Sequence, residues 1–171
     1  CDNPATIIPS TANTYMLRDE GRWGEVSVAC GAGRERIMAA TIYGYDAAAN
    51  NSVTYRMNES LIAKAILRLL EVGDIPYFLT GDFNINPEES RVIKHMIAIG
   101  LLIDIPAQFG HAGQHTFFAS GPEQGVEGKG RTRIDTVLTN KAGMAVTKDC
   151  KLRWDLTPHD HVPIELVLSL K

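Results

Sequence analysis

Two apolar runs near the start of the chain predict a β-hairpin. β-Branched and small apolar residues dominate residues 25–30 and 36–43, and Gly31-Ala32-Gly33 lies between the two runs. Short runs on both sides of a glycine-rich segment are typical of two strands joined by a turn. The segment lacks the third glycine and the following helix of a dinucleotide-binding fingerprint, so a turn is the preferred interpretation.

Two amphipathic helices are predicted further along the chain. Apolar residues recur at helical spacing over residues 59–72, and Gly73 provides a stop. Asn86-Pro87 is typical of a capping residue followed by a proline in the first helical turn. Apolar positions over residues 92–97 form one face of this second helix, which Gly100 closes.

Short apolar runs between and after these helices predict further strands. They cover residues 76–80, 116–118, 133–139, 145–149 and 162–170. Strands mixed with amphipathic helices indicate an α/β domain. The four glycines of residues 120–130 predict a surface loop, and no repeat or linker divides the chain into two domains.

Composition fits one globular, intracellular domain. The 171 residues are 44% hydrophobic, which is enough for one continuous core. No apolar run approaches the roughly 20 residues that cross a bilayer, and the chain shows no secretory leader, so we expect no membrane partner. Cys1, Cys30 and Cys150 lack the spacing of a zinc site. They favour free thiols in a reducing compartment, the cytoplasm or the nucleus, and the start at Cys1 suggests a segment of a longer protein.

Three polar clusters stand at the ends of predicted strands. They are Gly81-Asp82-Phe83-Asn84, Arg133-Ile134-Asp135 and His159-Asp160-His161-Val162-Pro163. A buried strand end is rigid, and catalytic groups require rigidity because a displacement of about 1 Å can cost roughly a hundredfold in rate. These clusters are therefore the candidate functional residues.

Each cluster also has a purely structural interpretation. Asp82 and Asn84 are typical of an Asx-turn, Asp135 could form an ion pair with a neighbouring arginine, and His161 could be a hydrogen-bonded loop histidine. Two pairs of histidines, at positions 111/115 and 159/161, have spacings that suit the binding of a transition metal. Glycines around the first pair favour a loop, and a phosphate contact is the preferred role for the second.

In this order the three clusters resemble the endonuclease/exonuclease/phosphatase superfamily, of which pancreatic DNase is the best-known member. The resemblance covers residues 24–170 and includes the strand at 24–27 and Thr-Ile-Tyr at 41–43. It implies a DNase I-like, four-layer α/β sandwich with its site at the rim where two sheets meet. It also implies metal-dependent hydrolysis of a phosphate ester, because a cation and fixed donors neutralise the charge of the transition state.

The resemblance assigns catalytic roles to the matching residues. Asp82 would orient and deprotonate the attacking water, and the Asn84 amide would donate to a non-bridging phosphate oxygen. His161 would act as a general acid/base at the phosphate, with its imidazolium held by Asp135. Tyr43 matches a family position that often holds a Tyr or His at the phosphate.

Metal and substrate contacts are expected nearby. Asp160 resembles the family residue that binds the metal ion or contacts one of its ligands. The ion implied is Mg²⁺, with Mn²⁺ as the alternative. Residues 126–154 carry seven basic and three acidic residues, although the whole chain has a net charge of −3. Within this segment Lys129, Arg131 and Arg133 directly precede Asp135 and are candidates for binding flanking phosphates.

Two motifs of the family are missing. Family members carry an Asn on the first strand and a metal-binding Glu on the second, both upstream of the strand at residue 24. Glu20 and Glu25 are the nearest carboxylates, but they lie before or within the third strand of the family pattern. His159 replaces a usual Ser, and no Pro follows Tyr43. We therefore expect one domain over residues 1–171 that lacks the family's N-terminal strands.

The sequence thus predicts a metal-dependent phosphoesterase, an endonuclease acting on DNA or RNA. The basic segment favours a polymeric substrate, and a reverse-transcriptase-linked endonuclease of a mobile element is one parent that fits. Within the same fold, the alternative is a phosphatase or phosphodiesterase acting on phosphoinositides or sphingolipids. An alternative of another class is a catalytically silent scaffold that binds nucleic acid.

Overall fold

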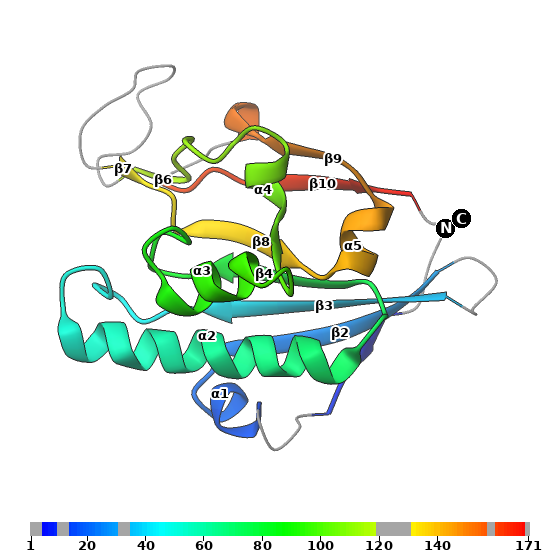
Figure 1. Cartoon of the computed structure of the whole chain (residues 1–171), viewed down its shortest axis with the longest axis horizontal. Helices are drawn as coiled ribbons and strands as arrows, with labels where there is room; N and C mark the ends of the chain where they lie inside the picture. The colour runs from blue at the N-terminus through cyan, green and yellow to red at the C-terminus, as the bar shows by residue number, and fades with distance from the viewer. Residues whose placement is uncertain (1–4, 10–13, 31–34, 119–130, 157–159, 170–171) are drawn as a thin grey trace.

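The computed structural model describes residues 5–9, 14–30, 35–118, 131–156 and 160–169, and its centre is a six-stranded mixed sheet (Figure 1). In sheet order the strands are β1 (Ala5–Ile7), β2 (Trp23–Cys30), β3 (Glu35–Tyr43), β4 (Tyr77–Asp82), β8 (Asp135–Thr139) and β5 (Ile103–Asp104). β3 and β4 run parallel, and the other neighbouring pairs are antiparallel. The predicted hairpin is confirmed as β2 and β3, and its turn lies outside the described residues.

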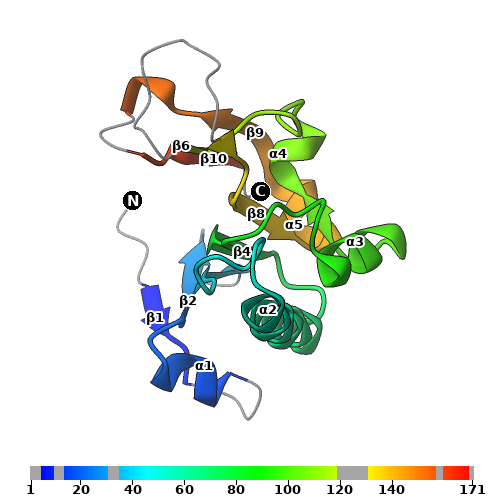
Figure 2. The same ribbon diagram turned by 90° about the vertical axis from the view of Figure 1, so that its left-hand side faces the viewer.

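Helices cover one face of this sheet. The long helix α2 (Ser52–Val72) lies along it, and α1 (Tyr15–Asp19) and α3 (Arg91–Ala98) are on the same side (Figures 1 and 2). The apolar face of α2 is buried in one cluster with β3 and β4, and each buried Leu or Ile stabilises the fold by about 1.5–3 kcal/mol. None of the helices in the described ranges is long and apolar enough to cross a membrane.

A second sheet of two strands covers the opposite face, where β9 (Thr147–Leu152) pairs antiparallel with β10 (Ile164–Leu168). β6 (Phe117–Phe118) and β7 (Arg131–Thr132) pair in a separate two-stranded sheet. A second apolar cluster joins side chains of both sheets, including Phe78, Val137 and Ile164. Cys30 and Cys150 are free thiols buried in this cluster, as the sequence predicts.

The layers confirm the predicted α/β class. Viewed end on, the helices, the six-stranded sheet and the β9–β10 pair follow one another (Figure 2). On the outer face of β9 and β10, Lys151 and Val167 are exposed to solvent. The described residues therefore form three of the four layers of the predicted sandwich.

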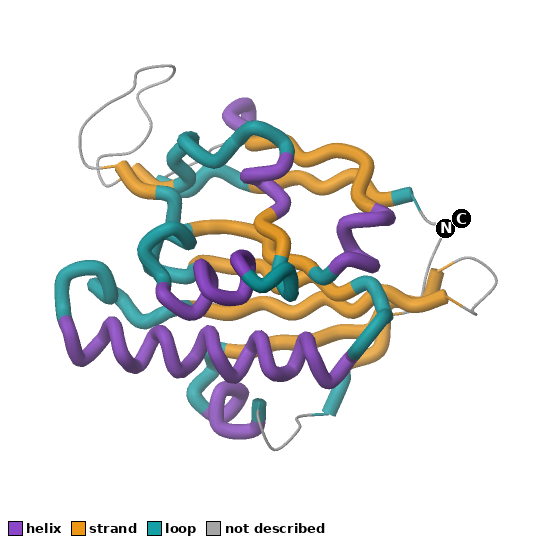
Figure 3. Tube along the Cα trace, viewed as in Figure 1, coloured by secondary structure: helices purple, strands orange, loops and turns teal. Residues whose placement is uncertain are grey.

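Several element boundaries differ from the prediction. Helix α2 begins at Ser52, because the side chain of Asn51 accepts the N–H groups of Val53 and Thr54. Asn86 forms a turn instead of a helix cap, and Ser90 caps α3. The predicted strand at 145–149 is part helix, since α5 (Lys141–Val146) precedes β9. The sequence pattern did not predict β1, α1, α5 and α4 (Ile105–Gln108), which are short (Figure 3).

Candidate active site

Three of the predicted site residues lie side by side on neighbouring strands. The strand register pairs Tyr43 of β3 with Asp82 of β4, and it pairs Asp82 with Asp135 of β8. Directly paired residues carry their side chains on the same face of a sheet. Because β8 runs antiparallel to β4, the beginning of β8 meets the ends of β3 and β4 at one edge.

His161 reaches the same edge from the second sheet. It forms an isolated bridge with Phe117, and the two rings lie 4.9 Å apart. Its Nδ1 is 2.9 Å from Oδ2 of Asp135. Ligand atoms of Asp82, Asp135 and His161 all lie within 4.8 Å of one another. One residue from each of the three clusters therefore lies in a single patch.

The surroundings of the patch are partly enclosed. The Thr116 Oγ1 accepts the N–H groups of Ile134 and Asp135 at 3.1 and 2.9 Å, which fixes the start of β8. A cavity of about 590 Å³ adjoins the three ligand residues, and its far wall is apolar, with Val137, Ile164 and Leu166. The site thus joins a charged end to a low-dielectric wall, where electrostatic interactions are stronger than in water.

The electrostatics of the cluster favour proton binding. Burial raises the pKa of Asp82 to about 6. The hydrogen bond from the Asn84 N–H lowers this pKa, whereas the negative charge of Asp135 raises it further. Burial also raises the pKa of Asp135, although its hydrogen bond to His161 opposes the change. For His161, burial lowers the pKa, but the hydrogen bond and charge of Asp135 outweigh it and the net pKa is raised. A cation would relieve the same carboxylate repulsion.

Asn84 is held beside the cluster by its backbone and side chain. Its N–H donates to Oδ1 of Asp82 at 2.8 Å, which forms the predicted Asx-turn, and its φ of 50° is one that Asn tolerates. Its Nδ2 donates to the Gly44 carbonyl at 3.1 Å and to Oδ1 of Asp46 at 3.3 Å. The hydroxyl of Tyr43 donates to the same Asp46 oxygen at 3.1 Å. Asp46 therefore orients both Tyr43 and Asn84.

Helix α2 ties together the two loops that carry these residues. The buried Asn58 donates from Nδ2 to the Phe83 carbonyl at 2.7 Å, and its Oδ1 accepts the Tyr45 N–H at 3.1 Å. Between them, Gly44 donates its N–H to the Asp82 carbonyl at 2.7 Å. A Cβ at Gly44 would lie 2.3 Å from the Phe83 oxygen, so this close approach requires glycine.

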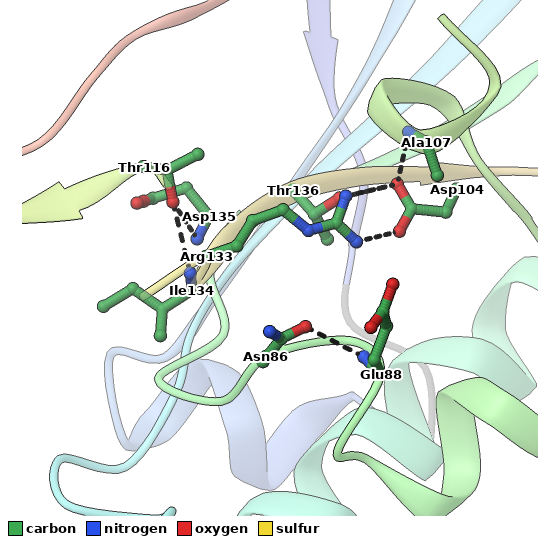
Figure 4. Close-up of polar contacts among 9 residues, drawn as sticks. All are labelled: Asn86, Glu88, Asp104, Ala107, Thr116, Arg133, Ile134, Asp135 and Thr136. Carbon is green, nitrogen blue, oxygen red and sulfur yellow. Dashed lines mark hydrogen bonds and ion pairs between the residues drawn. The ribbon is translucent and has the colours of Figure 1, made fainter. Parts of the chain in front are cut away.

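The predicted phosphate contact of Arg133 is wrong. Its side chain is 2% exposed and pairs with the carboxylate of Asp104 (Figure 4). The Asp104 carboxylate also accepts the Thr136 hydroxyl at 3.1 Å and the Ala107 N–H at 3.3 Å. The carboxylate of Asp135 contacts His161, and Arg133 pairs with Asp104 instead. Lys129 lies outside the described residues, and of Arg131 the structure describes the backbone in β7.

Asp160 does not join the ligand cluster of the described residues. It is exposed, and its carbonyl accepts the Phe118 N–H at 2.8 Å. The charge of Asp160 nevertheless contributes to the raised pKa of His161. Glu25 pairs with Arg68 of α2, and Glu20 accepts the Tyr45 hydroxyl at 2.5 Å. Neither glutamate belongs to the cluster of Asp82, Asp135 and His161.

Sequence reasoning missed three residues that support the site, namely Asp46, Asn58 and Thr116. Asp46 follows Tyr43 by three residues, and an acidic residue shortly after a candidate strand end was the one available signal. Asn58 lies in a helix and Thr116 in a loop, and their partners are distant in the sequence. No local pattern distinguishes them from ordinary surface residues.

Asp82 is expected to make the metal-free protein less stable as the pH rises. Folding raises its pKa from 3.8 to about 6, so the folded state binds this proton more tightly than the unfolded state. The resulting stability is fully present below the unfolded pKa and is lost as the pH rises through the folded pKa. The variant Asp82→Asn, neutral at every pH, should therefore become increasingly more stable than the wild type between pH 4 and 8. Urea unfolding in chelator measures this, and a pH-independent difference would contradict it.

Comparison with solved structures identifies the fold. An AP endonuclease from Archaeoglobus fulgidus is similar over 98% of this chain and 72% of its own, with a TM-score of 0.64 and 19% identity. The endonuclease domain of TRAS1, a telomere-specific non-LTR retrotransposon, is similar over 99% of this chain and 70% of its own, with a TM-score of 0.65 and 15% identity. The 3′ phosphatase NExo from Neisseria, bound to a product DNA hairpin, is similar over 97% of this chain and 70% of its own, with a TM-score of 0.60 and 18% identity.

The two comparisons by sequence, in contrast, found no match. No family model matches the chain, and no curated protein matches it significantly. The structural similarity nevertheless confirms the predicted fold: the chain has the DNase I-like fold of the endonuclease/exonuclease/phosphatase superfamily.

Proposed function

We propose that this DNase I-like chain is a metal-dependent phosphoesterase that hydrolyses phosphodiester bonds of DNA or RNA. The observation that carries the proposal is the convergence of Asp82, Asp135 and His161, whose ligand atoms lie within 4.8 Å of one another at the sheet edge. Two carboxylates and an imidazole in one patch supply both cation ligands and proton-transfer groups.

The donor set fits a hard divalent cation. Two carboxylates with raised pKa values stand close together, and oxygen donors of this kind are the ligands that Mg²⁺ or Mn²⁺ prefers. Asp82 and Asp135 would hold the ion beside His161. When bound, it would neutralise charge that develops on the phosphoryl oxygens.

The remaining chemistry belongs to the side chains. Asp82 orients the attacking water and accepts its proton, which is the general-base role of a positioned carboxylate. The Asp135 contact engages Nδ1 of His161 and leaves Nε2 for the phosphate. The raised pKa of His161 favours the protonated imidazole, which is the form that donates a proton. Asn84 and Tyr43 lie beside the cluster, and on substrate binding they would exchange their hydrogen bonds to Asp46 for bonds to the phosphate.

Nucleic acid is the substrate class that the comparisons favour. Two of the similar structures are endonucleases, and a third is a phosphatase bound to a DNA hairpin. At 15–19% identity these likenesses support the proposal through the fold alone. The similarity to a retrotransposon endonuclease domain also supports the proposal of a mobile-element parent. An intracellular site of action, in the cytoplasm or the nucleus, goes with this substrate.

A nicking assay tests the proposal. The purified chain is incubated with supercoiled plasmid and with single-stranded oligonucleotides, in Mg²⁺ or Mn²⁺ and in chelator. Cleavage that disappears in chelator is expected. Binding without cleavage, in a folded protein with an intact response to metal, would favour the silent nucleic-acid-binding scaffold instead.

Metal binding is expected to stabilise the fold in a pH-dependent manner. The cation competes with protons for the Asp82 and Asp135 carboxylates, so Mg²⁺ should raise Tm more at pH 8 than at pH 5.5. Thermal unfolding with and without Mg²⁺ measures this, and Asp135→Asn should reduce the shift at both pH values. Asp149→Asn is the matched control, because Asp149 lies on the outer face of β9 and pairs with Lys151. Equal shifts in the wild type and Asp135→Asn would place the ion elsewhere.

A further inference from the structure

We infer that Arg22, with the rings of Tyr43 and Tyr45, binds a nucleic-acid phosphate that flanks the scissile phosphodiester. This inference rests on the proposed function, because it extends the substrate path outward from the same sheet edge. The sequence had assigned the binding of flanking phosphates in part to Arg133, but Arg133 is buried in an ion pair. Arg22 is a cation that can bind such a phosphate instead.

Arg22 continues the row of site residues across the sheet. The Tyr43 N–H donates to the Arg22 carbonyl at 3.1 Å, one residue beyond the Trp23 and Ile42 pair of β2 and β3. Tyr43 in turn pairs with Asp82. Neighbouring strands lie about 4.8 Å apart, so the backbone of Arg22 is two strands, or roughly 10 Å, from that of Asp82. A lone phosphate held at the cluster does not span this distance, whereas a chain of phosphates does.

The guanidinium is already held in place. Its Nη1 donates to the carbonyls of Tyr43 and Gly44 at 3.0 and 2.8 Å. Its central carbon lies 3.9 Å from the ring centroid of Tyr45 and 5.5 Å from that of Tyr43. A planar, pre-oriented guanidinium loses less side-chain freedom when it binds a phosphate than a free one does.

The charge of Arg22 is available to a ligand. Within the described ranges no carboxylate forms an ion pair with it, and the nearby Glu20 accepts a hydrogen bond from Tyr45. Arg68, Arg133 and Arg153, by contrast, are each paired with carboxylates. An unpaired cation beside an acidic cluster is suited to a substrate with several negative charges.

The neighbouring aromatic rings point to nucleic acid as the polyanion. Tyr43 is 49% exposed, so one of its faces is accessible beside the cation. Aromatic faces next to cations are the common means of binding single-stranded nucleic acid without sequence preference, through stacking of bases and contacts with phosphates. We expect Arg22 to contribute affinity for any sequence and none for a specific base.

Binding of a labelled oligonucleotide in chelator tests this without requiring catalysis. Arg22→Gln should weaken binding by about tenfold and lower the slope of log affinity against log salt by about one. Arg22→Lys should keep most of the slope, since it keeps the charge. Arg36→Gln is the matched control, because Arg36 is also an exposed arginine. It lies on β3 seven residues before Tyr43, which places it roughly 23 Å from Tyr43, toward the opposite end of the sheet. Unchanged affinity and slope in Arg22→Gln overturn the inference.

A second measurement separates substrate binding from support of the loop. A small phosphodiester such as bis(p-nitrophenyl) phosphate has no flanking phosphate, so Arg22→Gln should hydrolyse it at the wild-type rate while cleaving oligonucleotides more slowly. Equal losses on both substrates would show that Arg22 merely holds the Gly44 loop, and would overturn the inference. If the wild type cleaves neither substrate, the proposed function fails while the binding data still decide the role of Arg22.

Discussion

Asp82→Asn is expected to lower the rate of phosphodiester hydrolysis by about a thousandfold, within the range that a general base contributes. Asparagine has the shape of aspartate but accepts no proton from water. It also removes one of the two carboxylates that would hold the cation. Plasmid nicking and oligonucleotide cleavage under single-turnover conditions measure the loss.

The stability of this variant separates chemistry from misfolding. In chelator at neutral pH, Asp82→Asn should unfold at a higher urea concentration than the wild type, because burial disfavours the charged carboxylate. Asp149→Asn, an exposed change on the outer face of β9, should keep the wild-type rate. A folded Asp82→Asn variant that retains most of the activity would exclude the proposed role.

Asp104→Ala is expected to destabilise the protein by about 3–5 kcal/mol, the range for removing one partner of a buried ion pair. The guanidinium of Arg133 would be left as an uncompensated charge, since its side chain is 2% exposed. The Thr136 hydroxyl and the Ala107 N–H would lose the same acceptor (Figure 4). Urea unfolding measures the free energy of unfolding.

Two controls accompany this change. The double variant Asp104→Leu with Arg133→Met should recover most of the stability, because a buried ion pair replaced by apolar groups is often tolerated. Asp155→Ala breaks another Arg–Asp contact, but its side chain is 63% exposed and the change should have little effect. If Asp104→Ala destabilises no more than Asp155→Ala, the Arg133 pair is not the structural element described above.

The local part of the site was predictable because strand ends have a strong sequence signal. The apolar run before Gly81 predicts a strand, and the polar residues after it occupy the partly buried edge of the sheet. The two interpretations of Asp82 and Asn84 are compatible, since the Asx-turn is present and the same residues adjoin the cluster. Proximity in sequence did not predict the partner of Arg133, because the pairing of β5 with β8 brings Asp104 near it.

The sequence by itself determined the α/β class, the main strands and the residue types of the candidate site, because periodicity and residue type act over a few neighbouring residues. Tertiary structure decided which charges meet. Strand pairing placed Asp82 beside Asp135, and packing of the second sheet brought His161 into contact with Asp135. Arg133 became buried in an ion pair that supports the fold, whereas Arg22 has no ion pair among the described residues. These outcomes depend on the register of distant strands and on solvent access, and both arise only when the whole chain has folded.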